Sequence, residues 1–212
     1  MKTLIKTSLV GALLALSNTA MAEWSANLGW ASEYHFRGFF QHSSSASGGV
    51  DYESGGFYAG TWAADVGDGL EVDGYAGYGT TVGDVDLSVG YTGYFYTGDF
   101  DDTYQEINLG ASFGILSLDV AVGEYDGDFD DLTPGDQQDY TYYALTLEKG
   151  GFYATYAGFS QDIEGEYLEL GYGTTVTDAE IDLGVALILA NDDLIGDDDE
   201  SLVFTIGKSF DL

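Results

Sequence analysis

The sequence predicts an all-β protein, a closed antiparallel transmembrane β-barrel of about 12 strands in an up-and-down meander. Three observations lead to this prediction. Apolar residues recur at every second position in segments of about ten residues. The chain of 212 residues has 31 Gly and 17 Tyr but one Pro. After residue 22, no stretch approaches the roughly 18 uninterrupted apolar residues of a spanning helix. If this protein crosses a membrane, it does so with strands.

The first 22 residues have the pattern of a secretory leader. Lys2 and Lys6 give a positive start, Leu9 to Leu16 is a short apolar run, and Ala20-Met21-Ala22 is a small-residue cleavage site. We therefore expect a cleaved signal peptide at 1–22, a barrel at 23–212, and location in a bacterial outer membrane.

The first strand shows the alternation clearly. Trp24, Leu28, Trp30, Tyr34 and Phe36 share the parity expected to face lipid, whereas Glu33 and His35 have the opposite parity. The same test places Tyr58, Trp62 and Val66 outward. The remaining predicted strands are 46–52, 57–66, 70–80, 85–96, 104–113, 115–125, 140–148, 152–161, 166–174, 179–190 and 201–210.

Connections between these strands alternate in character, which predicts the topology. Short Gly- or Thr-rich turns at 53–56, 81–84, 114, 149–151 and 175–178 are expected on the periplasmic side. The connections at 37–45, 97–103, 126–139, 162–165 and 191–200 are mostly longer and acidic, as extracellular loops commonly are. The short connection at 67–69 is the exception.

Two short sequence motifs of the first half of the chain recur in the second half. Gly55-Gly56-Phe57-Tyr58-Ala59 returns as Gly150-Gly151-Phe152-Tyr153-Ala154, and 77–82 returns as 171–176. Either the first six strands are duplicated in the last six, or two turns have converged on the same chemistry.

The charge excludes several classes of partner. There are 37 acidic against 5 basic residues, a formal charge of −32, so nucleic acid and anionic surfaces, which are also negative, are not expected as ligands. Without cysteine, thiol catalysis and thiolate metal sites are excluded. Alternation alone would also suit a soluble β-sandwich, but outward aromatic residues near strand ends favour interfacial girdles and hence a membrane barrel.

Inward parity predicts an acidic lumen. Rings of carboxylates favour cations, so we expect a porin-like channel for small solutes or ions that prefers cations. The alternative is a plugged structural or adhesin-like barrel. The predicted lining residues are Glu33, Asp51, Asp65, Glu71, Asp73, Asp86, Glu106, Asp119, Glu169, Glu180 and Asp182, with Tyr75, Tyr94, Tyr140, Tyr142 and Tyr167. Arg37, the only arginine, is expected to pair with them, either to fix the first loop across the lumen or as a structural ion pair.

Two other chemistries are weaker candidates. Asp126, Asp128, Asp130 and Asp131 could bind calcium through clustered carboxylates, although the run lacks the Gly and Glu positions of a helix-loop-helix site. A lipid hydrolase would need His35 or His42, beside Ser43 to Ser45, and nothing else completes such a site. We therefore predict no enzyme and no cofactor.

At Ser32-Glu33-Tyr34-His35-Phe36-Arg37-Gly38, then Gln41, and at 55–62, the sequence resembles the TorF-type porin family of proteobacteria. These motifs lie in the first third of the chain. The resemblance implies an outer-membrane barrel that acts as a pore, without a settled substrate or catalytic residues. The expected partners are outer-membrane lipid and lipopolysaccharide, the barrel-assembly machinery, and small solutes or cations.

Overall fold

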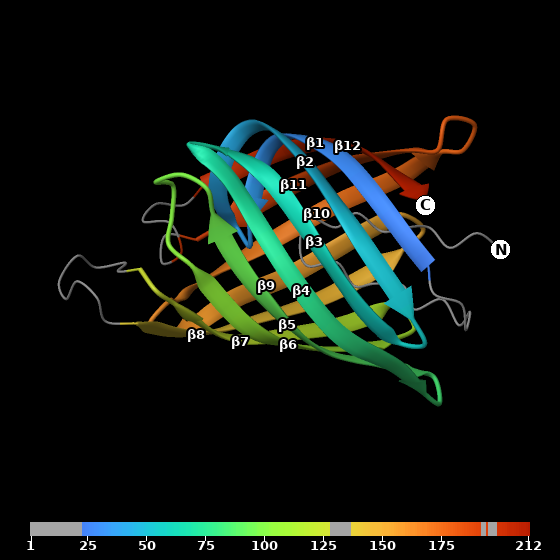
Figure 1. The fold of residues 1–212 in the computed structure, drawn as a ribbon, viewed down its shortest axis with the longest axis horizontal. Coiled ribbons are helices and arrows are strands. Elements are labelled where there is room, and N and C mark those ends of the chain that lie inside the picture. Colours follow the sequence, from blue (N-terminus) through green and yellow to red (C-terminus); the bar gives the residue numbers. More distant parts are fainter. Residues whose placement is uncertain (1–22, 128–136, 192–193, 195–198) are drawn as a thin grey trace.

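Twelve antiparallel strands close into one barrel in the computed structural model, which describes residues 23–127, 137–191, 194 and 199–212 (Figure 1). Each strand pairs with its neighbours in sequence, and β1 pairs with β12. The strands are β1 (Glu23–Phe36), β2 (Phe39–Ser54), β3 (Phe57–Gly67), β4 (Gly69–Val82), β5 (Val85–Tyr96), β6 (Tyr104–Phe113), β7 (Leu116–Tyr125), β8 (Gln138–Lys149), β9 (Phe152–Gln161), β10 (Gly165–Val176), β11 (Ile181–Ala190) and β12 (Asp199–Asp211). The predicted fold class and meander are confirmed.

The seam between the first and last strands completes the hydrogen-bond ladder. Seven residue pairs join β1 to β12, from Ser25 with Asp211 to Ala31 with Thr205, and the amide of Leu212 donates to the carbonyl of Trp24 at 2.9 Å. Closure removes the unpaired edges that an open sheet would present. Among the described residues no helix is long and apolar enough to span a membrane.

The outward face of the wall is apolar around the barrel. Leu28 on β1, Leu109 on β6 and Phe204 on β12 are each at least half exposed, at 62%, 51% and 51%. Trp24 and Trp30, which the alternation places outward, are exposed there, and so are Tyr78 and Tyr91. A soluble protein rarely exposes a continuous apolar surface of this extent, whereas the hydrocarbon of a bilayer would cover it.

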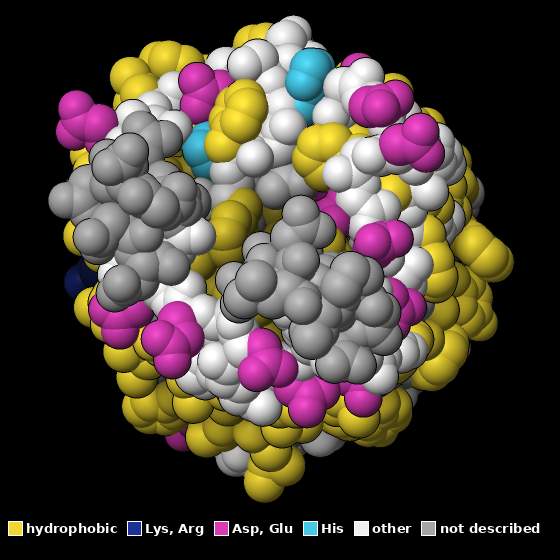
Figure 2. Space-filling view, turned by 90° about the vertical axis from the view of Figure 1, so that its left-hand side faces the viewer, with side chains coloured by type: hydrophobic (Ala, Val, Ile, Leu, Met, Phe, Trp, Pro, Cys, Tyr) yellow, Lys and Arg dark blue, Asp and Glu magenta, His cyan; other side chains and the backbone are white. Residues whose placement is uncertain are grey.

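The two ends of the barrel differ. At one, which we call the turn end, tight turns join β2 to β3, β4 to β5, β6 to β7, β8 to β9 and β10 to β11 (Figure 1). Glu23 lies there too, because it pairs with Glu53. The opposite end, the loop end, carries the other connections. Figure 2 looks onto the loop end and shows Asp and Glu side chains around its rim.

The repeated sequence motifs occupy equivalent places in the wall. Tyr58 pairs with Gly77 between β3 and β4, and Tyr153 pairs with Gly171 between β9 and β10. In both pairs the tyrosine ring lies where a Cβ on the glycine would be. The glycines therefore make room for inward-facing aromatic rings at two matching positions.

The segment 37–45, expected as a loop, continues the sheet instead. Backbone pairing between β1 and β12 stops at Ala31, and pairing between β2 and β3 begins at Ser47. Beyond these points, residues 32–44 pair only with one another as a hairpin, which we call the arm. Phe36 and Phe39 form its last pair, so Arg37-Gly38 is a two-residue turn.

Both turn residues have positive φ, 50° for Arg37 and 92° for Gly38, as a type I′ hairpin turn requires. An L-residue with a side chain pays about 1 kcal/mol for that conformation. Arg37 is thus held in an unfavourable backbone conformation at the tip of the arm.

Candidate functional site

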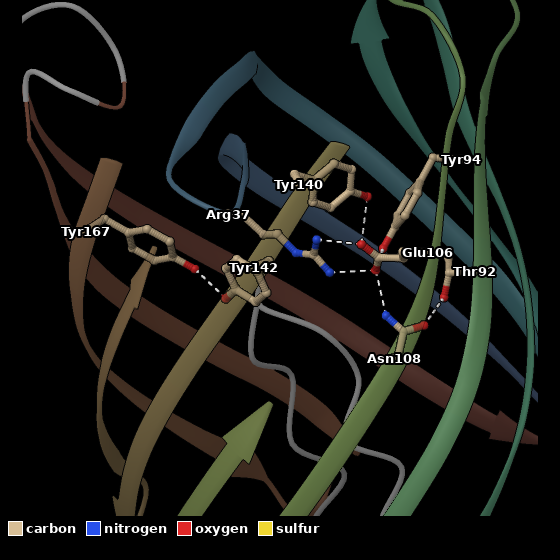
Figure 3. Close-up of polar contacts among 8 residues, drawn as sticks. All are labelled: Arg37, Thr92, Tyr94, Glu106, Asn108, Tyr140, Tyr142 and Tyr167. Carbon is tan, nitrogen blue, oxygen red and sulfur yellow. Dashed lines mark hydrogen bonds and ion pairs between the residues drawn. The ribbon is translucent and has the colours of Figure 1, made fainter. Parts of the chain in front are cut away.

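The arm enters the barrel interior at the loop end and carries Arg37 to the opposite wall (Figure 3). The guanidinium donates two hydrogen bonds to the Glu106 carboxylate on β6, from Nη1 to Oε2 at 2.7 Å and from Nη2 to Oε1 at 2.6 Å. It also lies over the Tyr142 ring of β8, with 4.1 Å from Cζ to the ring centroid. Both ends of the ion pair are buried. This bidentate geometry is the strong form of an Arg–carboxylate pair.

Three further donors, all from the wall, hold the Glu106 carboxylate. Oε1 accepts hydrogen bonds from the Tyr94 hydroxyl at 2.8 Å and from Asn108 Nδ2 at 2.6 Å, and Oε2 accepts one from the Tyr140 hydroxyl at 2.8 Å. We call Glu106, Asn108, Tyr94, Tyr140 and Tyr142 the Glu106 site. Because these residues belong to β5, β6 and β8, the carboxylate is oriented by the wall independently of the arm.

A second buried carboxylate binds the base of the arm. Glu71 on β4 accepts hydrogen bonds from the Tyr34 hydroxyl at 2.5 Å and from the Tyr96 hydroxyl at 2.9 Å. Two residues further along the strand, Asp73 is also buried, and its Oδ1 has no hydrogen-bond partner. Asp73 pairs in register with Tyr94, which donates to Glu106, so two further carboxyl groups lie on the wall beside the Arg37–Glu106 pair.

Aromatic packing fills the rest of the loop-end half. Phe36 contacts the Tyr94 ring at 5.2 Å and Phe39 contacts the Phe159 ring at 5.7 Å between centroids. Tyr34 packs against Trp62 at 5.7 Å. The buried cluster that receives the arm comprises Tyr94, Tyr104, Ala121, Tyr125, Tyr140, Tyr142, Ala144, Ala157, Phe159, Ile163, Tyr167, Ile188, Ala190, Leu194 and Val203. The arm therefore occupies the loop-end half of the interior and packs against its inner wall.

The turn-end half is different in chemistry and in packing. Its inward positions are mainly small and polar, and all of the following keep solvent-accessible surface: Ser25, Asn27, Gly29, Asp86, Ser88, Gly90, Gly110, Ser112, Ser117, Asp119, Gly173, Thr175, Asp182, Gly184, Thr205 and Gly207. Asp51 accepts hydrogen bonds from Tyr75 and Asn27 on the same side. No Lys or Arg lies on this inward face in the part of the chain that the structure describes. The inward face of this half, which we call the turn-end chamber, is therefore accessible to solvent and acidic.

Most predicted lining residues face the interior, in two groups. Glu71, Asp73, Glu106, Glu169, Tyr94, Tyr140, Tyr142 and Tyr167 are buried in the loop-end half, and Asp51, Asp86, Asp119, Asp182 and Tyr75 line the turn-end chamber. Glu169 accepts a hydrogen bond from the Tyr153 hydroxyl at 2.5 Å. Their part in selectivity stays a prediction.

Three predicted lining residues lie elsewhere. Asp65 pairs with the exposed Leu70 and faces outward, because β3 presents Tyr58, Trp62 and the buried Val66 to the interior, opposite to the predicted parity. Glu180 lies in the turn after β10, with a φ of 52°. Glu33 lies on the arm, where its Oε2 is 3.1 Å from His35 Nε2. Tyr34 and Phe36, expected toward lipid, pack inside because the arm leaves the wall.

Sequence reasoning missed two members of this network. Asn108 shares strand parity with Glu106 and could have been found from that spacing. Tyr34 could not, because its outward parity is reversed by the arm, where the register shifts between Tyr34 and His35.

The structure gives no support to the calcium site or to the lipid hydrolase considered from the sequence. Within the described ranges no group of three or more His, Cys, Asp or Glu side chains is placed to hold a metal ion. Asp126 accepts a hydrogen bond from Gln137, while Asp128, Asp130 and Asp131 lie outside the described residues. His35 is buried against Phe40, and among the hydrogen bonds of the described chain none joins either histidine to a serine.

Comparison with solved structures finds partial similarity to porins. A BenF-like porin from Pseudomonas fluorescens Pf-5 is 12% identical with a TM-score of 0.42, over 86% of this chain and 59% of the porin. The outer membrane protein opdK from Pseudomonas aeruginosa is 12% identical with a TM-score of 0.40, over 80% and 58%. A doubly substituted OccD1 (OprD) is 13% identical with a TM-score of 0.42, over 92% and 67%. The chain thus spans between 58% and 67% of the length of these proteins.

Comparison of the sequence with known proteins gives a family. No curated protein matches the chain. Residues 16–183 match the model of a family described as bacterial protein of unknown function (Gcw_chp). This match covers most of the chain, including β1 to β10. The chain therefore belongs to the Gcw_chp family of bacterial proteins.

Proposed function

We propose that this protein is an outer-membrane channel for the passive diffusion of small solutes or ions, that it prefers cations, and that the arm closes it in the conformation described. The observation that carries the proposal is the turn-end chamber. Asp51, Asp86, Asp119 and Asp182 lie on its accessible inward face, without a basic side chain beside them in the described chain. Carboxylates facing water lower the energy of cations and raise that of anions.

Location in the outer membrane is supported by the apolar outward wall, the closed ladder and the secretory pattern of residues 1–22, which lie outside the described residues. The resemblance of residues 32–38 and 55–62 to TorF-type porins agrees with this function. The proposal needs no catalytic group.

Ion selectivity tests the proposal directly. At roughly 10 Å in water, one carboxylate changes the energy of a monovalent ion by about 0.4 kcal/mol before salt screening. Screening at a Debye length of about 10 Å reduces this to about 0.15 kcal/mol. Two carboxylates act with opposite sign on cation and anion, so the double variant Asp119→Asn/Asp182→Asn should change their relative energies by about 0.6 kcal/mol. We therefore expect it to lower the cation-to-anion permeability ratio roughly threefold in planar bilayers. Asp84→Asn, in the exposed turn between β4 and β5, is the matched control and should leave the reversal potential unchanged.

A second candidate is a permanently plugged structural or adhesin-like barrel, which the aromatic packing of the arm favours. Conductance distinguishes the two. Current through the wild type, or through a Glu106→Gln variant when the wild type is silent, supports a channel that the arm closes. If neither protein conducts, although each shows the heat-modifiable mobility of an intact barrel, the result supports the plugged barrel and rejects the channel.

A further inference from the structure

We propose that the Glu106 site is a binding site for a solute that carries a guanidinium group, and that Arg37 of the arm occupies it as an internal substitute for that solute. The proposal rests on the channel function above, because an external solute can reach the site only in a barrel that admits it. It adds a substrate class to that function.

The first argument is that the site is built without the arm. Tyr94, Asn108 and Tyr140 fix both oxygens of Glu106 from three strands, and Tyr142 is fixed in turn by a 2.9 Å hydrogen bond to the Tyr167 hydroxyl on β10. Removing Arg37 would leave a carboxylate already aimed at the interior beside an aromatic face. A binding site for an external solute needs this kind of preorganisation.

The second argument is that the geometry selects a guanidinium among cations. Both oxygens of Glu106 face the two Nη atoms, at 2.7 and 2.6 Å, and the guanidinium carbon lies 4.1 Å from the Tyr142 ring centroid. A planar fork can make two parallel hydrogen bonds and stack on a ring simultaneously, whereas an ammonium is a point charge that cannot do both in the same way. We therefore expect L-arginine to bind more tightly than L-lysine.

The third argument is the position of the site between the closed half and the accessible chamber. Asn108 Oδ1 accepts a hydrogen bond from Thr92 at 2.9 Å, and both residues are partly exposed on the inward wall. Asp119 is partly exposed on the neighbouring strand β7, where it pairs with Gly110 of β6. A cation that enters the chamber thus meets carboxylates leading to Glu106, and its binding competes with the Arg37 contact that holds the arm.

Titration calorimetry of the purified barrel in detergent tests the proposal. The variant Arg37→Ala vacates the site, and L-arginine is titrated against L-citrulline, which has nearly the same shape but a neutral end group. We expect Arg37→Ala to bind L-arginine at least tenfold more tightly than L-citrulline, and at least tenfold more tightly than the wild type does. The double variant Arg37→Ala/Glu106→Gln should lose this preference.

Arg37→Gln is measured in parallel, so that failure of one variant to assemble, seen as lost heat-modifiable mobility, leaves the test intact. Equal binding of L-arginine and L-citrulline by an assembled variant, or no binding of either, would overturn the proposal. That result would leave the channel function standing if the wild type or Glu106→Gln still conducts cations. Conversely, selective binding without conductance in any variant would show that the solute enters the interior but ions do not pass through, which would reject the channel and keep the guanidinium site.

Discussion

Replacement of Glu106 by Gln tests whether the ion pair holds the arm in place. Gln keeps the size of the side chain but removes the charge that Arg37 faces. Breaking a buried pair by removing one partner costs about 3–5 kcal/mol, because the other charge stays buried without compensation. If the arm relieves this cost by leaving the interior, the ratio of open to closed arm rises by about 10²- to 10³-fold, at 1.4 kcal/mol per factor of ten.

Thiol labelling measures this change on a clean background, because the chain has no cysteine. His35 lies on the arm and is 4% exposed, so His35→Cys reports when the arm leaves the interior. The rate of modification by a bilayer-impermeant maleimide is compared between His35→Cys and His35→Cys/Glu106→Gln. The second protein should react at least a hundredfold faster. Glu124→Gln, which removes an exposed outward carboxylate on β7, is the control and should not alter the rate.

Equal labelling rates, within about twofold, would refute the reasoning. The aromatic contacts of Phe36 and Phe39 would then hold the arm without help from the ion pair, since burial of each such ring is worth about 1.5–3 kcal/mol.

Two further predictions concern the wall. Gly77→Ala should destabilise the barrel by about 1–3 kcal/mol, because the new Cβ would collide with the Tyr58 ring, whereas Gly74→Ala on the same strand meets nothing within 4 Å and should be tolerated. The midpoint of urea unfolding in lipid vesicles checks this, and equal midpoints would contradict the packing described. Leu109→Arg, on the outward face of β6, should cost about 2–4 kcal/mol in the same assay, whereas Ser112→Arg, on the inward face, should cost less. A smaller loss of stability for Leu109→Arg than for Ser112→Arg would contradict a lipid-facing position of Leu109.

The sequence was sufficient for most of the wall, because most strands carry their own alternation and four of the five tight turns contain glycine. The predicted bounds of β5, β6 and β9 coincide with those observed, and most others differ by one to three residues. Closure into a barrel could also be predicted from the sequence, since a sheet that faces hydrocarbon cannot leave an edge unpaired.

The arm could not be predicted from alternation, because it leaves the wall. Parity assumes that one side of every strand meets lipid and the other meets water. Once the arm fills the loop-end half, the interior there needs apolar partners, so Trp62 and Val66 face inward and Asp65 is displaced to the outside. The bidentate contact between Arg37 and Glu106 joins residues 69 positions apart, and spacing alone does not reveal it.

The backbone pairs of the arm join arm residues only to one another. The backbone pairs that join neighbouring strands around the wall all lie outside residues 32–44, so tube and stopper are separate modules. Natural variation could therefore reshape the stopper, and with it the cargo admitted, while the tube stays unchanged. A variant in which a short turn joins Ala31 directly to Ser47 would be an unobstructed barrel, and a designer could graft other hairpins onto it.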